Sequence, residues 1–580
     1  MKNKSLLFKN VMQLLLFGVL FYIVYIYTTG SLLTPAFKHD MYAMYIMPIK
    51  NHSILFMLYV AVALFFFGIN FKKKNERKCY IVAGISFLLL LLSLYTIGEI
   101  TFLNENTIVS SIFFVVNLIF LTTALFFLTY LNKLNVYSFY FATIIPLGII
   151  FYFVFLPWSV PDAVRHMAAT YRFSNIVLQQ DEWSARKSDD DFFKNVWLEH
   201  KYKNPSKTGY NDILSQINQK VDNETIKEVS IKDEAMKCYS FVSYMPLIIG
   251  IVMGRIFNFN TVWMLYLAKL SMFLLYVSGI FLAIRTIPKL KYIMAMMAML
   301  PISLMYTSGF SYDGMVIIVS FNFIASVLAL HEKYSRHQAI MLLVWSFLLP
   351  AVKGGGYIIL LPLIFILKNY KLNLMVLITA CVSLLLFSDF LYTDKPMFQF
   401  EYLEEGYLST SFALEHPLQY LRMAVLMYVK RFDYILYTML GARLGWPILS
   451  AVEPTIEPFF VVMMFVLMLF ACVKDEETTH EGIKYNTGLI VTLFLGCLSI
   501  PLLLLRETKI GADVVFGIQG RYYLPLLPIF MLLISSIAKK LPLKISAIIK
   551  KIDMKTILFL YTCIAYICVY CMLVTFLRTI

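Results

Sequence analysis

Charged side chains are scarce in this sequence: only 15% of its 580 residues are Asp, Glu, Lys or Arg. Soluble chains carry about 25% of such residues. Hydrophobic residues make up 60% of the sequence and aromatic residues 16%. This composition excludes a soluble multidomain protein and predicts an all-α polytopic membrane protein.

The cysteines are scattered along the sequence, without the regular spacing of a disulfide or metal-binding motif. Most of the eight cysteines lie in apolar segments, at Cys381, Cys472, Cys497, Cys563, Cys568 and Cys571, whereas Cys238 lies in a long polar segment. This distribution suggests neither a disulfide framework nor a cysteine metal site. No internal repeat is strong enough to suggest the inverted halves of a secondary transporter. Nothing indicates a cofactor, although the sequence leaves a divalent metal open.

Positive charge exceeds negative charge, with 50 Lys and Arg residues against 35 Asp and Glu. In a soluble domain this excess would raise the question of a nucleic-acid partner. Here the lysines cluster in short loops between apolar runs, so membrane topology explains much of the excess. We therefore expect a lipid bilayer, and no nucleic acid, as a partner.

The first five apolar runs of spanning length lie near 10–28, 53–71, 79–97, 109–131 and 138–157. The first has no convincing cleavage site and is interpreted as a retained span. The loop after the second run reads KKKNERK, whereas the loop after the third, GEITFLNENT, has no basic residue. The positive-inside rule then places the N-terminus in the cytoplasm. Five spans bring the chain to the extracytoplasmic side at Pro157.

Residues 158–260 form the longest segment without a span, and we expect membrane-parallel helices within this first outer loop. Its last part, 241–257, is apolar but short and interrupted by Pro246 and Gly250. It is predicted to be an interfacial or re-entrant helix. That assignment keeps the basic residues after the next span in the cytoplasm, namely Arg285, Lys289 and Lys291.

Ten further spans bring the predicted total to about fifteen. They lie near 262–284, 291–307, 313–330, 338–351, 356–369, 373–392, 457–473, 486–505, 521–538 and 556–577. The two short runs at 338–351 and 356–369 are expected to hinge at the sequence KGGGY. A second outer loop, 393–456, carries charges suited to a membrane interface, at Arg422, Lys430, Arg431 and Asp433. We divide the chain into N-terminal helices (1–135), a transmembrane core (136–540) and a C-terminal cytoplasmic loop with the last helix (541–580).

Asp162 and His166 are the leading candidates for catalysis. They follow the fifth span in LPWSVPDAVRHMAATYRFSN. If Pro161 occupies the first helical position, the acid and the imidazole lie one turn apart on one helix face. A carboxylate there can take a proton from a hydroxyl. Each residue has a plainer alternative: Asp162 caps a surface helix, and His166 only pairs with Asp162 or stacks in the loop.

Polar residues also mark the outer ends of other spans: Lys269, Asp313, Lys353 and Arg521. Charges of both signs on one side of the membrane suggest a polar cavity. The alternatives are a helix cap for Asp313 and snorkelling anchors for Lys353 and Arg521. The run Asp189 to Asp191 resembles a metal-binding acidic motif, but a helix N-terminus is the preferred interpretation.

Six blocks in order resemble one family. They are SVPDAVRHMAATYRFSN, YSFVSYMPLIIGIVMGRIF, LYLAKLSMFLLYVSGIFLAIRTIP, MLPISLMYTSGFSYDGMVI, PAVKGGGYIILLPLI and GIQGRYYLPLLPIF. The chain resembles, over roughly 138–538, the bacterial membrane-protein family called domain of unknown function 2142, which is similar to the GT-C superfamily of glycosyltransferases. The sequence departs from the family at Ala163, where an acid is usual, and at Lys269, where an Arg is usual.

The resemblance implies a fold and a reaction. GT-C enzymes transfer sugars from polyprenyl-phosphate or polyprenyl-diphosphate donors, with an acid of the first outer loop as base. Asp162 would be that base, and His166 would orient it or contact the donor. Substrate binding would fall to Arg521, Lys353, Lys269, Asp313, Gln519, Tyr244, Tyr357 and Tyr522.

The expected location is the bacterial cytoplasmic membrane, with an extracytoplasmic site. The expected partners are a polyprenyl-phosphate-linked sugar and a cell-envelope glycan acceptor. The alternatives are a transporter or flippase for a lipid-linked oligosaccharide, and a glycan polymerase or ligase.

Overall fold

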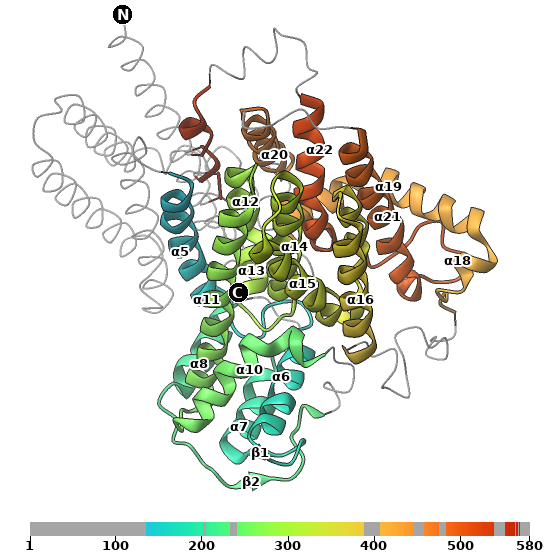
Figure 1. Cartoon of the computed structure of the whole chain (residues 1–580). Coiled ribbons are helices and arrows are strands. Elements are labelled where there is room, and N and C mark those ends of the chain that lie inside the picture. The colour runs from blue at the N-terminus through green and yellow to red at the C-terminus, as the bar shows by residue number, and fades with distance from the viewer. Residues whose placement is uncertain are drawn as a thin grey trace, which may run out of the picture. The chain divides into compact units, whose positions relative to one another are not determined.

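The computed structural model of the chain describes residues 135–200, 205–232, 240–387, 406–444, 449–450, 457–474 and 483–538, with parts of 552–568. The chain divides into two compact units, one of 1–150, 450–456 and 552–580, the other of 151–449 and 457–551. Nearly all the described elements belong to the second unit (Figure 1). The first four predicted spans lie outside the described residues.

The predicted first outer loop is a small helical layer. After α5 (Val136–Val154), its elements are α6 (Ala163–Val177), β1 (Ala185–Arg186), α7 (Lys187–Phe192), the π-helical turn η3 (Phe193–Trp197), α8 (Lys207–Gln216), β2 (Thr225–Ile226) and α10 (Phe241–Ile256). β1 and β2 pair in antiparallel fashion. Figure 1 shows α6, α7, α8 and α10 grouped at one end of the second unit. Short helices were expected in this loop, and the structure has them.

The acidic run begins a helix, as predicted. Asp189 and Asp190 lie in the first turn of α7. The buried Asp189 carboxylate accepts hydrogen bonds from Arg186 Nε (2.8 Å), Tyr171 Oη (2.7 Å) and Thr261 Oγ1 (2.7 Å). These donors satisfy the carboxylate from within the chain. Asp189 therefore connects α6 and α7 with the first residue of α11 (Thr261–Thr286).

α10 lies directly against α11 (Thr261–Thr286). The closest approach is at Gly250, where a Cβ would lie 2.3 Å from the Ala268 Cα. α10 continues through both Pro246 and Gly250, so the predicted interruption of the segment is wrong. At 16 residues the helix is about 24 Å long, shorter than a membrane span. Its short length agrees with the prediction, whereas its position in a membrane stays a prediction.

Seven helices of the described residues are long and apolar enough to span a membrane. They are Val136–Val154, Thr261–Thr286, Asp313–Glu332, Arg336–Gly355, Tyr370–Phe387, Ile483–Glu507 and Gly520–Ile537. These segments contain α14 (Asp313–Glu332), α15 (Arg336–Ala351), η4 (Val352–Gly355), α16 (Tyr370–Phe387), α21 (Ile483–Leu503), η6 (Leu505–Glu507), η7 (Gly520–Leu526) and most of α22 (Leu527–Ala538). Of the seven, α14 has the largest buried share, so it is the central helix of the bundle.

Shorter elements complete the described bundle. They are α12 (Lys291–Ala298), α13 (Pro301–Thr307), η5 (Ile358–Ile366), α18 (Phe412–Glu415), α19 (Pro417–Leu440), β3 (Arg443–Leu444), β4 (Leu449–Ser450) and α20 (Glu457–Lys474). In the predicted second outer loop, Arg422, Lys430 and Arg431 lie on exposed positions of α19. α19 is not among the seven candidate spans.

Two predicted spans have a different form. The expected span at 291–307 is split into α12 and α13, because Pro301 lacks an amide hydrogen and the preceding Leu300 is extended (ψ 136°). The expected span at 356–369 contains the 3₁₀ helix η5, with Pro362 inside it. The predicted hinge between 338–351 and 356–369 is confirmed. There Lys353 and Gly354 adopt left-handed conformations.

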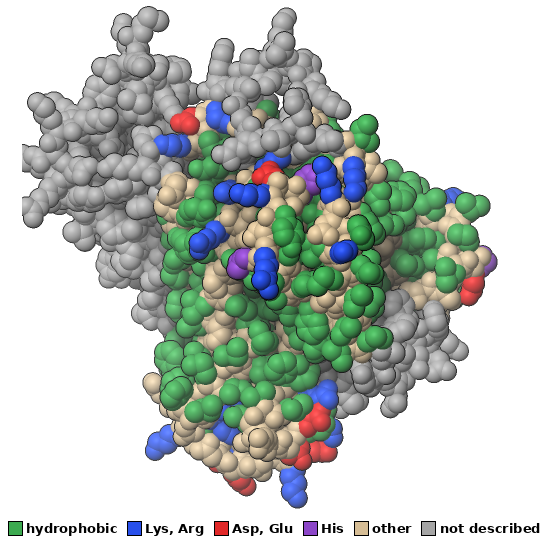
Figure 2. Space-filling view, viewed as in Figure 1, with side chains coloured by type: hydrophobic (Ala, Val, Ile, Leu, Met, Phe, Trp, Pro, Cys, Tyr) green, Lys and Arg blue, Asp and Glu red, His purple; other side chains and the backbone are tan. Residues whose placement is uncertain are grey.

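The two ends of the bundle differ in charge. Near the C-terminal end of α14, Lys289 Nζ lies 3.2 Å from Glu332 Oε1 and Lys484 Nζ bonds the Leu367 carbonyl at 3.3 Å. Figure 2 shows mostly basic side chains in the upper part of the visible face, hydrophobic side chains covering its middle, and basic and acidic side chains together at its lower end. The loops predicted to be cytoplasmic therefore converge on one end. α14 is 20 residues long, so its start at Asp313 is about 30 Å away.

Candidate functional site

Four charged residues meet at the N-terminal end of α14. Arg521 Nη1 lies 3.4 Å from Asp313 Oδ2, and Arg521 Nη2 lies 3.7 Å from Asp162 Oδ2. Lys353 Nζ lies 3.7 Å from the other oxygen of Asp313. We call Asp162, Asp313, Lys353 and Arg521 the charge cluster. Sequence analysis named all four residues, and the structure brings them together from four separate segments.

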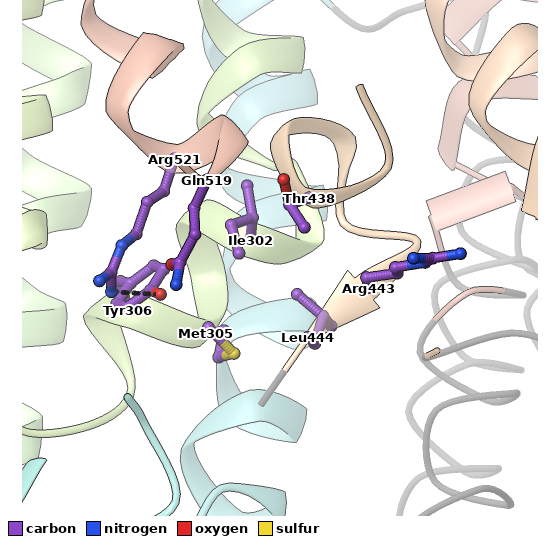
Figure 3. A pocket seen from close by; sticks show the side chains of 8 residues that line it. All are labelled: Ile302, Met305, Tyr306, Thr438, Arg443, Leu444, Gln519 and Arg521. Carbon is purple, nitrogen blue, oxygen red and sulfur yellow. Dashed lines mark hydrogen bonds between the residues drawn. The ribbon is translucent and has the colours of Figure 1, made fainter. Parts of the chain in front are cut away.

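Close backbone packing fixes the position of Arg521. A Cβ at Gly520 would lie 2.1 Å from the Ile435 carbonyl oxygen, so only glycine allows η7 to lie this close to α19. The Gly520 amide also donates to Thr438 Oγ1 at 2.7 Å. The next side chain, Arg521, is only 5% exposed and donates to Tyr306 Oη (Figure 3). The buried guanidinium is thus held by neighbours on α13, α14 and η7.

Two members of the cluster have left-handed backbone conformations, Asp162 (φ 62°) and Lys353 (φ 52°). Each costs roughly 1–2 kcal/mol in a residue other than glycine. Such strain is concentrated at functional sites, where surrounding contacts maintain it. The Lys353 amide, for example, donates to Ser243 Oγ at 3.2 Å.

Asp162 lies just outside helix α6. The helix begins at Ala163, so the predicted placement of Pro161 and Asp162 within its first turn is wrong. Asp162 occupies the N-cap position, but its side chain makes no capping hydrogen bond. The carboxylate is instead directed toward Arg521 and is 29% exposed. Helix capping therefore does not account for this side chain.

His166 is paired with Tyr244 rather than with Asp162. Its Nδ1 lies 3.0 Å from Tyr244 Oη. Its ring packs edge-on against Tyr312, with 4.7 Å between the two ring centroids. The side chain is buried, and burial lowers the pKa of His166 from 6.5 to about 4. The imidazole is therefore neutral at neutral pH, so one ring nitrogen can donate a hydrogen bond and the other can accept one.

The low pKa of His166 predicts an acid-sensitive fold. Between pH 6.5 and 4 the unfolded chain binds a proton at this imidazole and the folded chain does not, so stability falls as pH falls. The loss approaches about 3 kcal/mol at pH 4. We expect the gap in melting temperature between the parent and His166→Gln to narrow from pH 7.5 to pH 4.5. A constant gap, measured on detergent-solubilised protein, would contradict this.

Tyrosine rings surround the cationic members of the charge cluster. Lys353 Nζ lies 4.3 Å from the Tyr522 ring centroid, 5.0 Å from that of Tyr312 and 5.6 Å from that of Tyr357. The Arg521 guanidinium carbon lies 4.9 Å from the Tyr306 ring centroid. These contacts stabilise the cations. The same kind of aromatic surface can receive a sugar ring or a prenyl chain.

Lys269 lies elsewhere, against the end of α5. The fully buried side chain donates from Nζ to the carbonyl oxygens of Tyr152 (2.6 Å) and Phe155 (2.5 Å). It also lies over the rings of Tyr152 and Tyr266. These contacts give it a structural role, closing the C-terminal end of a helix. The structure does not place it in the charge cluster.

We expect Lys269→Met to lower stability without weakening phosphate binding. The change removes both hydrogen bonds and leaves two buried carbonyls unpaired, at roughly 1–3 kcal/mol each. The melting temperature should fall by several degrees, while the affinity for a prenyl phosphate stays within twofold of the parent. A tenfold loss of affinity in a folded variant would support the role in substrate binding expected from sequence.

The remaining predicted residue, Gln519, lines a small pocket beside Arg521, with about the room of one water molecule. Figure 3 shows Gln519 next to Arg521 and Tyr306, whereas Arg443 of the same pocket points away from them. The pocket is smaller than a usual ligand site. Sequence analysis missed Tyr306 and Tyr312, although both lie in the block MLPISLMYTSGFSYDGMVI and Tyr312 directly precedes Asp313.

These features define a helical membrane protein with a charged, tyrosine-lined site at one end of its bundle. The chain belongs to the family described as predicted membrane protein (DUF2142), whose model matches residues 145–530, about two thirds of the chain. This match confirms the family resemblance found in the sequence. No curated protein and no solved structure matches the chain.

Proposed function

We propose that this protein is a membrane glycosyltransferase that moves a sugar from a polyprenyl-phosphate donor to a cell-envelope glycan. The observation that carries the proposal is the charge cluster, in which Asp162 Oδ2 lies 3.7 Å from the buried guanidinium of Arg521. A carboxylate that can take the proton of the acceptor therefore lies next to cations that can stabilise the leaving phosphate. The similarity of the chain's family to the GT-C superfamily, noted in the sequence analysis, also supports it.

The proposed step is a single displacement. The Asp162 carboxylate takes the proton of an acceptor hydroxyl, whose oxygen bonds to the anomeric carbon of the sugar. The bond from that carbon to the phosphate oxygen breaks, and its electron pair leaves with the phosphate. The products are the glycosylated acceptor, with inverted configuration, and polyprenyl phosphate. Arg521 and Lys353 offset the charge that develops on the phosphate, and Asp162 then releases its proton to water.

The charge difference between the two ends of α14 supports an extracytoplasmic site. Basic loops prefer the cytoplasm, and the charge cluster lies at the opposite end of this helix. A cysteine introduced at the exposed Asn223, in the same outer layer as α7 and in a chain whose Cys238 is replaced by Ser, tests this orientation. We expect a membrane-impermeant maleimide to label it in intact cells. Labelling only after cell disruption would place the layer in the cytoplasm and contradict the orientation.

The decisive experiment is transfer from a radiolabelled polyprenyl-phosphate sugar. The purified full chain is reconstituted in liposomes with a membrane-glycan acceptor fraction. We expect label to move from lipid to glycan only when the chain is present. Movement of the labelled lipid across the bilayer without transfer would overturn the proposal in favour of a transporter or flippase. Joining of preassembled glycans, with no use of the single-sugar donor, would instead indicate a polymerase or ligase.

A further inference from the structure

The three nitrogens of Arg521 have different surroundings. Nη1 donates to Tyr306 Oη at 2.5 Å and lies 3.4 Å from Asp313. Nη2 donates to Tyr522 Oη at 3.2 Å and lies 3.7 Å from Asp162. Nε is buried and has no hydrogen-bond partner within the described part of the chain. A buried donor without a partner costs roughly 1–3 kcal/mol, so it needs an explanation.

Arg186 shows how the edge of a guanidinium formed by Nε and Nη2 binds an anion in this chain. Its Nε and Nη2 bind the two carboxylate oxygens of Asp189 at 2.8 and 3.0 Å. This paired arrangement suits carboxylate and phosphate oxygens equally. In Arg521 the corresponding Nε and Nη2 are not bound in this way. The edge therefore offers an oxyanion the unpartnered Nε, with Nη2 beside it, whose second hydrogen is left over from its bond to Tyr522.

The cation beside this edge is also short of partners. Lys353 Nζ is buried and has no hydrogen-bond partner among the residues that the structure describes. Its closest carboxylate, Asp313, is 3.7 Å away, beyond hydrogen-bond distance. Two cations of one cluster thus retain unused donors.

The two acids that face Arg521 are not equivalent. Asp313 is 9% exposed and lies between Arg521 and Lys353, so leaving it without Arg521 would disturb a buried pair. Asp162 is 29% exposed and approaches only to 3.7 Å, too far for a hydrogen bond. Asp313 and Tyr306 can therefore hold Arg521 in place while Asp162 moves away.

We propose that Arg521 exchanges Asp162 for the donor phosphate, and that this exchange makes Asp162 available as the base. Two phosphate oxygens take the Nε and Nη2 edge, with Lys353 beside them, and the Asp162 carboxylate is released toward the acceptor. Donor binding then precedes productive acceptor binding. The inference rests on the proposed function and adds an order of events to it.

The test is the binding of farnesyl phosphate, a short prenyl monophosphate, to the detergent-solubilised full chain, with farnesol as the uncharged control. Because Asp162 competes for Arg521, we expect Asp162→Asn to bind farnesyl phosphate five- to tenfold more tightly than the parent does. Asp313→Asn makes the same change in charge beside the same guanidinium, and its gain should be at least threefold smaller. Farnesol affinity should be equal in all three proteins.

A second variant separates competition from a general change in the electric field. Lysine lacks the Nε and Nη2 edge. In a chain that already carries Arg521→Lys, Asp162→Asn should therefore not raise the affinity for farnesyl phosphate. Three results would overturn the exchange. The first is an equal gain in farnesyl phosphate affinity for Asp162→Asn and Asp313→Asn. The others are a gain for Asp162→Asn that persists with Arg521→Lys, and no gain in any variant. Thermal melting confirms the folding of each variant, and the Asp162 comparison stands if Asp313→Asn does not fold.

The outcomes distinguish this inference from the proposed function. If the parent transfers sugar but Asp162→Asn binds the probe no more tightly, the exchange is wrong and the transferase stands. If Asp162→Asn binds more tightly but the parent transfers no sugar, the exchange stands and the transferase is wrong. If the parent does not bind farnesyl phosphate, the exchange is wrong, and the transfer assay alone decides the function.

Discussion

Replacing Asp162 with Asn is expected to lower the rate of sugar transfer by about 10²- to 10⁴-fold, the usual contribution of a general base. Asn keeps the shape of the side chain but cannot take the proton of the acceptor hydroxyl. Because Asp162 is partly exposed and makes no capping hydrogen bond, the fold should survive. The measurement is the initial rate with a radiolabelled polyprenyl-phosphate sugar.

The matched control is Asp191→Asn, which makes the same change at an exposed position of α7. It should transfer sugar at the parent rate. A parent-like rate for Asp162→Asn would remove the proposed base. A low rate together with poor binding of farnesyl phosphate would show that Asp162 acts in binding and not in proton transfer.

Replacing Arg521 with Gln is expected to weaken farnesyl phosphate binding by at least tenfold and to destabilise the fold. The change removes the cationic edge and leaves the largely buried Asp313 with Lys353 as its only cation in the charge cluster. Breaking a buried ion pair costs about 3–5 kcal/mol. A lower melting temperature and a higher Kd are the two readouts.

The matched control for Arg521 is Arg443→Gln. Arg443 lines the same pocket, but its guanidinium points away from Arg521 and lies over the Tyr437 ring at 5.2 Å. Its farnesyl phosphate affinity should stay within about twofold of the parent. Equal losses for the two variants would indicate a general effect of positive charge and count against a specific role for Arg521.

Much of the fold could be predicted because apolar runs and basic loops leave a strong signal. Five of the described spans agree with their predicted ranges within three residues: Val136–Val154, Thr261–Thr286, Asp313–Glu332, Ile483–Glu507 and Gly520–Ile537. The prediction failed where backbone chemistry competed with hydropathy. Pro301 splits one predicted span, and η5 replaces α-helix in another. A hydropathy pattern counts apolar residues and is insensitive to such local changes of helix type.

The candidate site was predictable in its charges but not in its pairings. Charged residues at the ends of apolar runs are conspicuous, so Asp162, Asp313, Lys353 and Arg521 could be named from sequence. Lys269 gave the same signal, yet its amine is used by two carbonyls at the end of α5. Tyr306 could not be singled out, since a tyrosine in an apolar segment is unremarkable until a guanidinium is found beside it. The roles of these residues in catalysis and binding stay predictions.

The sequence by itself determined that this is a helical membrane protein, where its charges interrupt the apolar runs, and which family it resembles. These properties depend on composition and on spacing along the chain. Only the tertiary structure decided that Arg521 lies between Asp162 and Asp313 with its Nε left without a partner among the described residues. That arrangement depends on contacts between residues distant in the sequence, such as Gly520 against Ile435 and Arg521 against Tyr306, and no local pattern encodes such distances.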